Sequence, residues 1–427
     1  MILWLSAGLL GLLCLSIPVG IVLFLLGFGV DAFFSSFPLT RGLGNLVWST
    51  SNNATLIAIP FFVLLGEILV RSGVAARTYA ALDRWVSWLP GGLIHANIAT
   101  ATMFSATSGS SVATAATVAT VAMPQAEKLG YDQKLFSGAI AAGGTLGIMI
   151  PPSINLIVYG FLTQTSIPRL FLAGIVPGLG LALAFVIVTM MICMVRPTLG
   201  GARRVFPFIQ MLRALIQLVP IVLLFTIIIG SIYKGWATPT EAAAVGVAGA
   251  IAIAAIFGGV SRAMFTESLL GTIRITAMIM LVVIGASFLN FTLAAAGLGT
   301  ELEAFLTGLG LTPLGTILVV VLIYVVLGFF IETLSLMVVT IPIIVPLVVA
   351  QGYDPIWFGI LMIVLIEMAL ITPPVGLNLY VVQGARKSGF MSDVMLGAAP
   401  YVVTMLAMVA ALIAFPDIAL MLPDALN

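Results

Sequence analysis

Long apolar stretches, each about as long as a membrane is thick, restrict how this chain can fold. The hydrocarbon core of a bilayer is about 30 Å thick and requires about 20 apolar residues per helix. Only 7% of the residues are charged, so no soluble fold could hide this apolar surface. The sequence therefore predicts an all-α polytopic membrane protein, with nine crossings near 3–30, 46–70, 134–165, 170–195, 212–233, 241–258, 273–296, 356–385 and 391–415.

Charge and cysteine content exclude two other classes of protein. The formal net charge of +1 provides no basic surface, so no nucleic-acid partner is predicted. The two cysteines, Cys14 and Cys193, lie within apolar stretches, and we expect no disulfide framework. The first stretch lacks the basic residues of a signal peptide and is about twice as long as a signal peptide's apolar core. We therefore expect 3–30 to be a spanning helix in the lipid bilayer, kinked or tilted at Pro18.

Several landmarks recur in one order and at one spacing, which indicates a duplicated unit. Shared order at a fixed period is the sequence signature of an internal repeat. Each landmark of the first half has a counterpart 222 or 223 residues later: Gly-Tyr-Asp at 130 and 352, Pro-Pro at 151 and 373, a further proline at 124 and 346, and Asn155 with Asn378.

The repeat divides the chain into two units of opposite orientation. Residues 1–195 form the first repeat, 196–240 a cytoplasmic loop with a connecting helix, and 241–427 the second repeat. One unpaired helix between equal units inverts the second unit, and inverted-topology repeats are typical of secondary transporters. With the N-terminus in the cytoplasm and the C-terminus outside, 13 of the 16 Lys and Arg residues lie on the cytoplasmic side, in agreement with the positive-inside rule.

Charged and tryptophan residues share one short segment between the second crossing and the next apolar region. Arg77, Arg84, Trp85 and Trp88 all lie within 73–88. This combination predicts a helix in the membrane interface, and 297–311 is its counterpart in the second repeat.

Region 92–125 is expected to enter and leave the membrane on the same side. Its centre, from Ser105 to Ser111, is rich in Ser and Gly, too polar for a lipid-facing helix, while the whole region is too apolar for a solvent loop. A re-entrant helical hairpin satisfies both conditions, because irregular backbone at membrane depth is tolerated where protein or water surrounds it. Close helix packing through small residues is the alternative.

Region 314–349 is predicted to form a second re-entrant hairpin, with Glu332 near its tip. A carboxylate at the centre of a membrane helix costs at least about 2.5 to 3.5 kcal/mol unless it is paired or hydrated. Glu332 therefore indicates a functional or cavity-facing position. A glutamate that reaches the nearby interface is the alternative.

Each Pro-Pro pair interrupts a long apolar stretch and so predicts a broken helix in 134–165 and in 356–385. The breaks free backbone carbonyls, and with the nearby Ser, Thr and Asn oxygens these suit a hard cation such as Na⁺. The new helix N-termini favour an anion, often a carboxylate. Two hairpin tips facing two broken helices predict a substrate and coupling-ion site near the middle of the membrane.

These motifs resemble the large membrane subunit of TRAP (tripartite ATP-independent periplasmic) transporters. The resemblance rests on SGSSVATAATVATVAMP with IPPSIN in the first half and on FIETLSLMVVTIPIIVP with ITPPVGLN in the second, and it covers essentially the whole chain. It implies a bacterial inner-membrane importer of small organic anions, often carboxylates, driven by Na⁺. The implied partners are a small four-helix membrane subunit and a periplasmic solute-binding protein.

The resemblance also implies a fold similar to divalent-anion/sodium symporters, in which hairpins and broken helices form a transport domain that moves like an elevator past a scaffold. No cofactor besides the coupling ion Na⁺ and no enzyme activity are implied. The implied substrate-binding residues are Ser108, Gly109, Ser110, Ser153, Asn155, Glu332, Thr333 and Gly376. The implied Na⁺-binding residues are Ser105, Ser111, Gly147, Pro151, Ser335, Thr372, Pro373 and Asn378.

Other functions remain open from the sequence. The chain could be a stand-alone Na⁺/dicarboxylate symporter, a passive channel, or an intramembrane hydrolase that uses Ser110 or Ser111 with His95. Glu67, Glu241 and Glu367 could bind ions or pair within the protein. The sequence does not identify which organic anion is carried.

Overall fold

The computed structural model describes residues 1–426 except 36, 258, 299–300, 302–309, 311 and 387, and of residues 2–3 and 105–108 it describes the backbone only. Within this part all regular secondary structure is helical, which confirms the predicted class. Six helices are long and apolar enough to cross a membrane alone, or up to eight if each of two bent pairs forms one span.

The first half of the chain contains short helices at its start and a single long helix at its end. Its helices are α1 (Ile2–Cys14), α2 (Val19–Phe34), η1 (Leu39–Gly42), α3 (Leu43–Ser51), α4 (Ala58–Arg71), α5 (Val74–Val86), α6 (Leu93–Ser108), α7 (Ser111–Leu129), α8 (Gln133–Met149), α9 (Ile154–Thr163) and α10 (Ile167–Val195).

The second half begins after a short connection with two helices that pack together. Its helices are η2 (Pro197–Gly200), α11 (Phe208–Tyr233), α12 (Pro239–Ile256), α13 (Arg262–Ala295), α15 (Pro313–Gly328), α16 (Thr333–Ala350), α17 (Pro355–Ala369), α18 (Leu377–Arg386), α19 (Met391–Ala414) and α20 (Asp417–Ala425).

Three predicted crossings differ from the helices observed. Stretch 3–30 is two helices, α1 and α2, because Pro18 lacks the N–H needed to continue α1. Stretch 46–70 is divided into α3 and α4 at a turn in which Asn53 Oδ1 accepts a hydrogen bond from Thr55 N at 2.9 Å. Helix α13 begins at 262 rather than 273, since Ser261 caps its N-terminus and its polar first turns are helical too.

Both regions expected to be hairpins fold as two packed helices. Helices α6 and α7 contact each other and are joined by Gly109 and Ser110, and α15 and α16 contact each other and are joined by residues 329–332. Gly109 has a φ of 57°, which glycine adopts without strain, so the chain reverses within two residues.

The repeated Gly-Tyr-Asp motif is a helix boundary in both halves. Gly130 ends α7 and Gly352 follows α16, with φ of 68° and 88°. Asp132 and Asp354 then cap the next helix, accepting hydrogen bonds from Leu135 N at 2.8 Å and from Ile356 N at 2.6 Å. The motif therefore ends a hairpin and starts a broken helix each time.

The two Pro-Pro pairs lie in the predicted breaks. Pro151 and Pro152 separate α8 from α9, whose axes differ by 41°, and Pro373 and Pro374 separate α17 from α18. The first break is entirely buried, whereas Pro373 is exposed.

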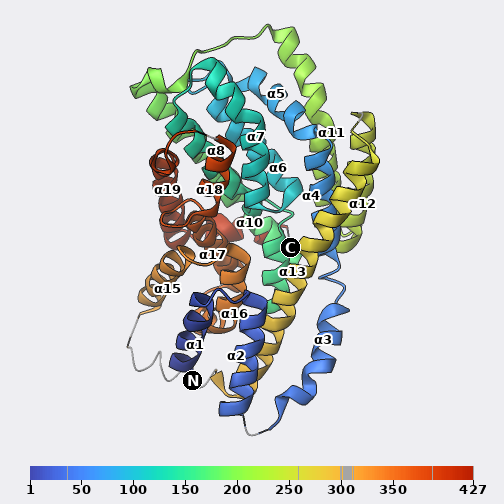
Figure 1. Ribbon diagram of the computed structural model, residues 1–427, viewed down its shortest axis with the longest axis vertical. Helices are drawn as coiled ribbons and strands as arrows, with labels where there is room; N and C mark the ends of the chain where they lie inside the picture. Colours follow the sequence, from blue (N-terminus) through green and yellow to red (C-terminus); the bar gives the residue numbers. More distant parts are fainter. Residues whose placement is uncertain are drawn as a thin grey trace.

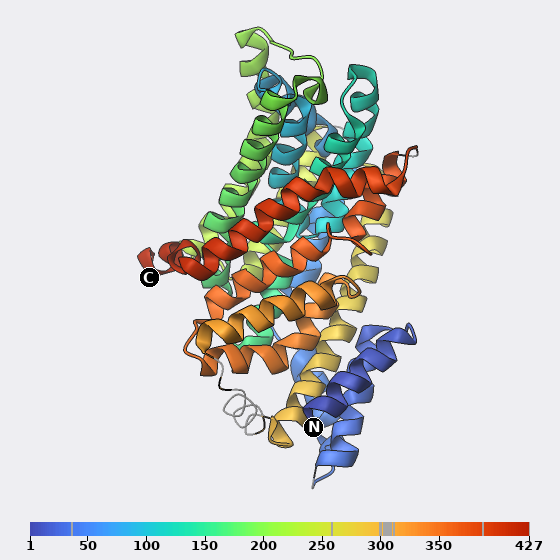
Figure 2. The same cartoon turned by 90° about the vertical axis from the view of Figure 1, so that its left-hand side faces the viewer.

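Long helices enclose the hairpins and broken helices from one side. Figures 1 and 2 show α13 extending along much of the molecule, and α13 packs against α2, α4 and α16. Helix α12 packs against α4 and α11. Helix α5, the predicted interfacial helix, is bent by 68° from α4, while its counterpart 297–311 lies mostly outside the described residues.

Candidate functional site

A cavity of about 90 Å³ lies where the two hairpin tips meet the first broken helix. Helix α13 closes one side through Ile275, Met278 and Ile279. Six of the predicted site residues line it: Gly109, Ser110 and Ser111 from the first tip, Asn155 from α9, and Glu332 and Thr333 from the second tip. The fold therefore brings polar residues more than 200 positions apart to one small cavity whose lining is mostly apolar.

The first hairpin tip is held against the broken helix by close backbone contacts. A Cβ on Gly147 of α8 would lie 2.9 Å from the carbonyl oxygen of Ser110 and 2.9 Å from Cα of Ser111, so only glycine permits this approach. Ser110 caps α7 by accepting a hydrogen bond from Ala113 N at 3.4 Å. The side chains of Ser105 and Ser108 lie outside the described residues.

The second tip places Glu332 at the N-terminus of α16. Its carboxylate accepts hydrogen bonds from Leu334 N at 3.1 Å and from Ser335 N at 3.0 Å, and Ser335 Oγ donates to it at 2.9 Å. Thr333 Oγ1 donates at 3.2 Å. Glu332 is thus a helix cap whose negative charge is stabilised by the α16 dipole, and it remains exposed at the edge of the cavity.

A buried carboxylate connects the two halves. Glu367 of α17 is fully buried, and its Oε2 accepts a hydrogen bond from Ser111 Oγ at 2.5 Å. The other oxygen, Oε1, is buried and has no hydrogen-bond partner in the part of the chain that the structure describes. The sequence had indicated only that Glu367 could bind an ion or pair internally. The sequence feature that could have indicated a central role for Glu367 is its position, six residues before Pro373 in an otherwise apolar stretch.

Asn378 follows the break in the second half, but its side chain contacts α8 of the first half. Its Nδ2 donates to the carbonyl of Ala141 in α8 at 3.2 Å, and its Oδ1 is buried without a hydrogen-bond partner among the residues described. Its backbone N–H bonds to Leu370 O at 3.1 Å, which seats α18 on the end of α17. Helix α18 packs against α7 and α8, while α9 packs against α16, so the second part of each broken helix lies beside the other half's hairpin.

The remaining predicted residues serve local structure and do not line the cavity. Ser153 caps α9 through Leu156 N at 3.3 Å, and Thr372 Oγ1 donates to Met368 O at 2.7 Å. Gly376 provides a turn with a φ of 53° before α18. Pro151 is buried next to α10, where a Cβ on Gly174 would lie 3.7 Å from its Cδ.

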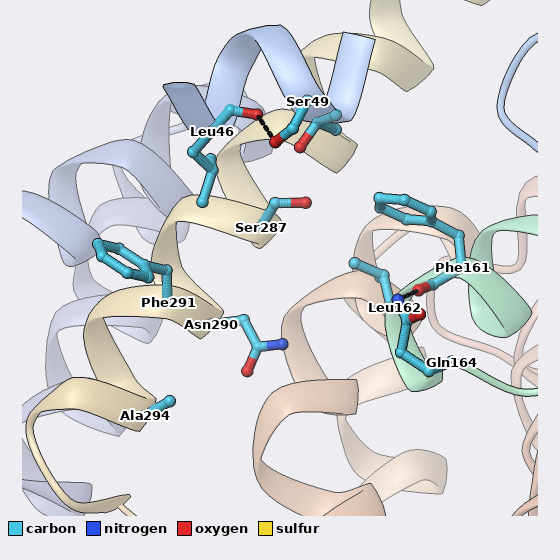
Figure 3. A pocket seen from close by; sticks show the side chains of 10 residues that line it. Leu46, Ser49, Phe161, Leu162, Gln164, Ser287, Asn290, Phe291 and Ala294 are labelled. Atoms are coloured by element: carbon cyan, nitrogen blue, oxygen red, sulfur yellow. Dashed lines mark hydrogen bonds between the residues drawn. The ribbon is translucent and has the colours of Figure 1, made fainter. Parts of the chain in front are cut away.

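A larger hollow of about 280 Å³ separates α3 and α13 from the end of α9. Figure 3 shows Ser287 and Asn290 of α13 facing Phe161 and Leu162 across open space. Ser287 Oγ is buried and, within the described residues, has no hydrogen-bond partner. None of the predicted site residues lines this hollow, which marks a loosely packed boundary between the long helices and the broken helix.

Buried oxygen atoms of α17 and α18 suit an alkali cation and not a transition metal. In the part of the chain that the structure describes, no group of three or more His, Cys, Asp or Glu residues could hold a metal ion. The unpartnered oxygens Glu367 Oε1 and Asn378 Oδ1 are instead hard oxygen donors in a buried setting. They fit the expected coupling ion.

Comparison with known proteins establishes the family. The family model of the tripartite ATP-independent periplasmic transporter, DctM component, matches residues 7–418. This chain belongs to the DctM family. Its members are transport proteins, which confirms the resemblance noted in the sequence and excludes the hydrolase alternative.

Two curated relatives of the DctM family match nearly the whole chain. The C4-dicarboxylate TRAP transporter large permease protein of Pseudomonas aeruginosa is 35% identical over 90% of each chain. The sialic acid TRAP transporter large permease protein of Vibrio cholerae is 32% identical over 98% of this chain and 97% of its own. The DctM-family chain described here is accordingly a multi-pass membrane protein and a transport protein.

The fold is shared with a distant solved structure. The YdaH transporter of Alcanivorax borkumensis, described as having an unusual topology, superimposes with a TM-score of 0.66 over 93% of this chain and 97% of its own at 14% identity. At this identity the similarity concerns the fold alone.

Proposed function

We propose that this chain is the membrane subunit of a TRAP transporter that imports a small organic anion together with Na⁺. The observation that carries the proposal is the cavity at the two tips. Asn155 Nδ2 is a buried donor there with no hydrogen-bond partner among the described residues, and it lies in the first turn of α9, whose positive end also favours an anion. The relatives named for a C4-dicarboxylate and for sialic acid support a carboxylate substrate.

The two hairpin tips differ in charge, so we assign them to the binding of different ligands. At the second tip Glu332 already occupies the N–H groups that begin α16, so an anionic substrate is repelled there. At the first tip no carboxylate caps α7. We therefore place the substrate carboxylate between Asn155 and Ser110, and Na⁺ nearer the carboxylates of the second half.

An inverted repeat accounts for the arrangement of the elements. Helices α6 to α10 correspond in order to α15 to α19, and the corresponding helices begin 220 to 224 residues apart. The packing is reciprocal, since α7 contacts α18 while α16 contacts α9, and α8 contacts α19 while α17 contacts α10. Reciprocal contacts of this kind are expected from a pseudo-two-fold axis between the halves.

Loose packing between the long helices and the hairpin-containing helices is compatible with an elevator movement of one group past the other. The cavity is far smaller than the roughly 300 Å³ of typical ligand pockets, so substrate entry requires a tip or α13 to move. We propose that α6–α9 and α15–α18 form the transport domain and that α2, α3, α4, α11, α12 and α13 form the scaffold. The hollow in Figure 3 lies between these two bodies.

The assembly follows from the family. We propose a bacterial inner-membrane complex with a small four-helix membrane subunit and a periplasmic solute-binding protein, with the N-terminus in the cytoplasm and the C-terminus in the periplasm. The alternatives are a stand-alone symporter and a passive channel.

Uptake into proteoliposomes tests the proposal. The complex is reconstituted with radiolabelled succinate and sialic acid as probes, with and without the binding protein, under an inward Na⁺ or K⁺ gradient. We expect accumulation only with both the Na⁺ gradient and the binding protein. Accumulation without the binding protein would identify a stand-alone symporter, and equilibration that ignores the Na⁺ gradient would identify a channel.

A further inference from the structure

Three charged side chains at one end of the molecule join α8, α18 and α19. Lys134 Nζ lies 3.1 Å from Asp393 Oδ1, and Arg386 Nη2 lies 3.3 Å from Asp393 Oδ2. Within the described residues neither cation forms an ion pair with a second carboxylate. Two positive charges therefore share one negative charge, and the cluster carries one positive charge in excess.

Arg386 is the member of this cluster whose hydrogen bonding is least complete. Only 8% of the residue is exposed, yet its Nε and Nη1 have no hydrogen-bond partner in the part of the chain that the structure describes. The guanidinium lies against Gly389 just before α19, where an added Cβ would overlap Nη2. A buried cation with unsatisfied donors is unfavourable unless an anion joins it.

The N-terminus of α19 adds positive potential at the same place. Asp393, the shared carboxylate, lies in the first turn of this helix. No described side chain caps α19, although the helix extends over 24 residues. Uncapped N–H groups at the start of a helix bind phosphate and other anions. Lys134 and Ser392 are exposed, so the first turn is open to a ligand from outside.

An apolar stripe on α19 begins beside this cluster and follows the helix away from it. The stripe consists of the exposed residues Leu396, Ala399, Val403 and Leu406, which recur at helical spacing. Helix α19 is long and apolar enough to cross a membrane, and Figure 2 shows it lying across the face toward the viewer. The stripe therefore faces the acyl chains of the bilayer, and the cluster lies at the level of the lipid headgroups.

The ligand that fits both features is a phosphate attached to an apolar body. A free phosphate would compensate Arg386 but would not use the stripe, whereas a phospholipid uses both. The predicted topology puts Lys134 and Arg386 on the cytoplasmic side, where basic pockets between membrane helices bind anionic headgroups. The excess positive charge favours an anionic lipid over a zwitterionic one, which brings its own cation.

We infer that Lys134, Arg386 and the first turn of α19 form a binding site for the phosphate of an anionic phospholipid, whose acyl chain lies along the α19 stripe. The site is separate from the cavity at the hairpin tips, and it depends neither on Na⁺ coupling nor on the identity of the substrate. Lys134 belongs to α8 and Arg386 to α18, and both helices pack against α19. A bound lipid therefore ties the two halves together at this end of the molecule.

The test measures thermal unfolding of the delipidated complex in detergent as a probe is added. The probes are phosphatidylglycerol, phosphatidylcholine and inorganic phosphate at equal ionic strength. The variants are Arg386→Gln and, as a matched control, Lys128→Gln, which removes an exposed positive charge at the end of α7. We expect phosphatidylglycerol to raise the Tm of the wild type and the control. Arg386→Gln should need at least about tenfold more of this lipid for the same rise.

The three probes separate the possible sources of phosphate. An equal rise with phosphatidylcholine would mean that lipid binds through the apolar stripe alone, and the inference is overturned. A rise with inorganic phosphate that phosphatidylglycerol does not exceed would assign the cluster to free phosphate and overturn the lipid site. If Arg386 serves only the fold, Arg386→Gln lowers the Tm by the same amount with and without lipid, which also rejects the site.

A second variant keeps the test decisive if Arg386→Gln does not fold. Ser392→Asp places a carboxylate in the first turn of α19, where a negative charge stabilises the helix but repels phosphate. Its Tm without lipid should equal or exceed that of the wild type, while its response to phosphatidylglycerol should weaken at least about tenfold. Native mass spectrometry checks binding directly: phosphatidylglycerol should stay bound to the wild type and to Lys128→Gln and be lost from Ser392→Asp. Retention of the lipid by Ser392→Asp would overturn the inference.

Discussion

At the scale of single residues, glycine decides how closely the first tip can approach α8. Gly147 faces backbone atoms of Ser110 and Ser111 at 2.9 Å from where its Cβ would lie, and backbone cannot yield as a flexible side chain does. We predict that Gly147→Ala costs about 1 to 3 kcal/mol, the usual range for overpacking, and strongly reduces uptake.

Thermal unfolding of Gly147→Ala, with uptake measured in parallel, checks this prediction. The control is Gly230→Ala in α11, where an added Cβ meets nothing within 4 Å. In a helix interior that change should be neutral or stabilising by up to about 1 kcal/mol. Equal behaviour of the two variants would mean that the tip does not pack against α8 as described.

Single residues also mark the limit of sequence reasoning. The family resemblance assigned Ser111 and Asn378 to Na⁺ binding, and the sequence placed Glu367 near Asn378 at the second break, but nothing in it connected Ser111 with Glu367. Ser111 and Glu367 are 256 positions apart in the sequence. They meet because the hairpin of each half packs against the broken helix of the other half. No local sequence pattern encodes this packing between the halves, which is a feature of the tertiary structure.

At the scale of helices and turns, local chemistry was readable wherever a residue acts on its own backbone. Proline pairs predicted the breaks, and Gly-Tyr-Asp coincides with helix ends in both halves. The predictions failed where a helix extends past its apolar run, as α13 does, or where Pro18 divides a stretch into two helices. Hydropathy alone locates apolar residues and does not set helix ends.

The cap of α16 separates the structural from the electrostatic role of Glu332. The corresponding position 222 residues earlier is Ser110, which caps α7 without a charge. We predict that Glu332→Ser keeps the stability within about 0.5 kcal/mol, because serine is a good N-cap, whereas Glu332→Ala loses about 1 kcal/mol.

Uptake measurements on the same variants test whether the negative charge of Glu332 is needed for transport. If the negative charge of Glu332 is needed for Na⁺ coupling, Glu332→Ser should lower Na⁺-driven uptake at least about tenfold although its Tm is preserved. Unfolding and uptake measurements on the Ser and Ala variants together check this. Normal uptake by Glu332→Ser would restrict Glu332 to a capping role.

At the scale of the whole molecule, the sequence predicted long helices as well as hairpins and broken helices. It did not predict how loosely these two groups of helices pack against each other. The long helices and the hairpin-containing body pack together through α13 and α2 against α16 and through α4 and α11 against α6, and the hollow beside α9 lies between them. At the hollow itself the packing is loose, and the Ser287 hydroxyl there has no hydrogen-bond partner among the described residues, so this part of the boundary offers little resistance to sliding. This is the physical basis for assigning the two bodies to a scaffold and a transport domain.

A cross-link across that hollow tests the movement. In a background with Cys14 and Cys193 replaced by serine and alanine, Asn290→Cys on α13 and Leu162→Cys on α9 face the same hollow in Figure 3. We predict that a short bifunctional maleimide joining them abolishes uptake, because α9 can then no longer move past α13. The control pair, Asn290→Cys with Ser49→Cys, joins α13 to α3 within the scaffold and should leave uptake within about twofold of the untreated protein. Full uptake by the cross-linked Asn290 and Leu162 pair would show that the two bodies do not slide at this boundary and would reject the elevator proposal, whereas loss of uptake confined to that pair would locate the moving boundary between α9 and α13.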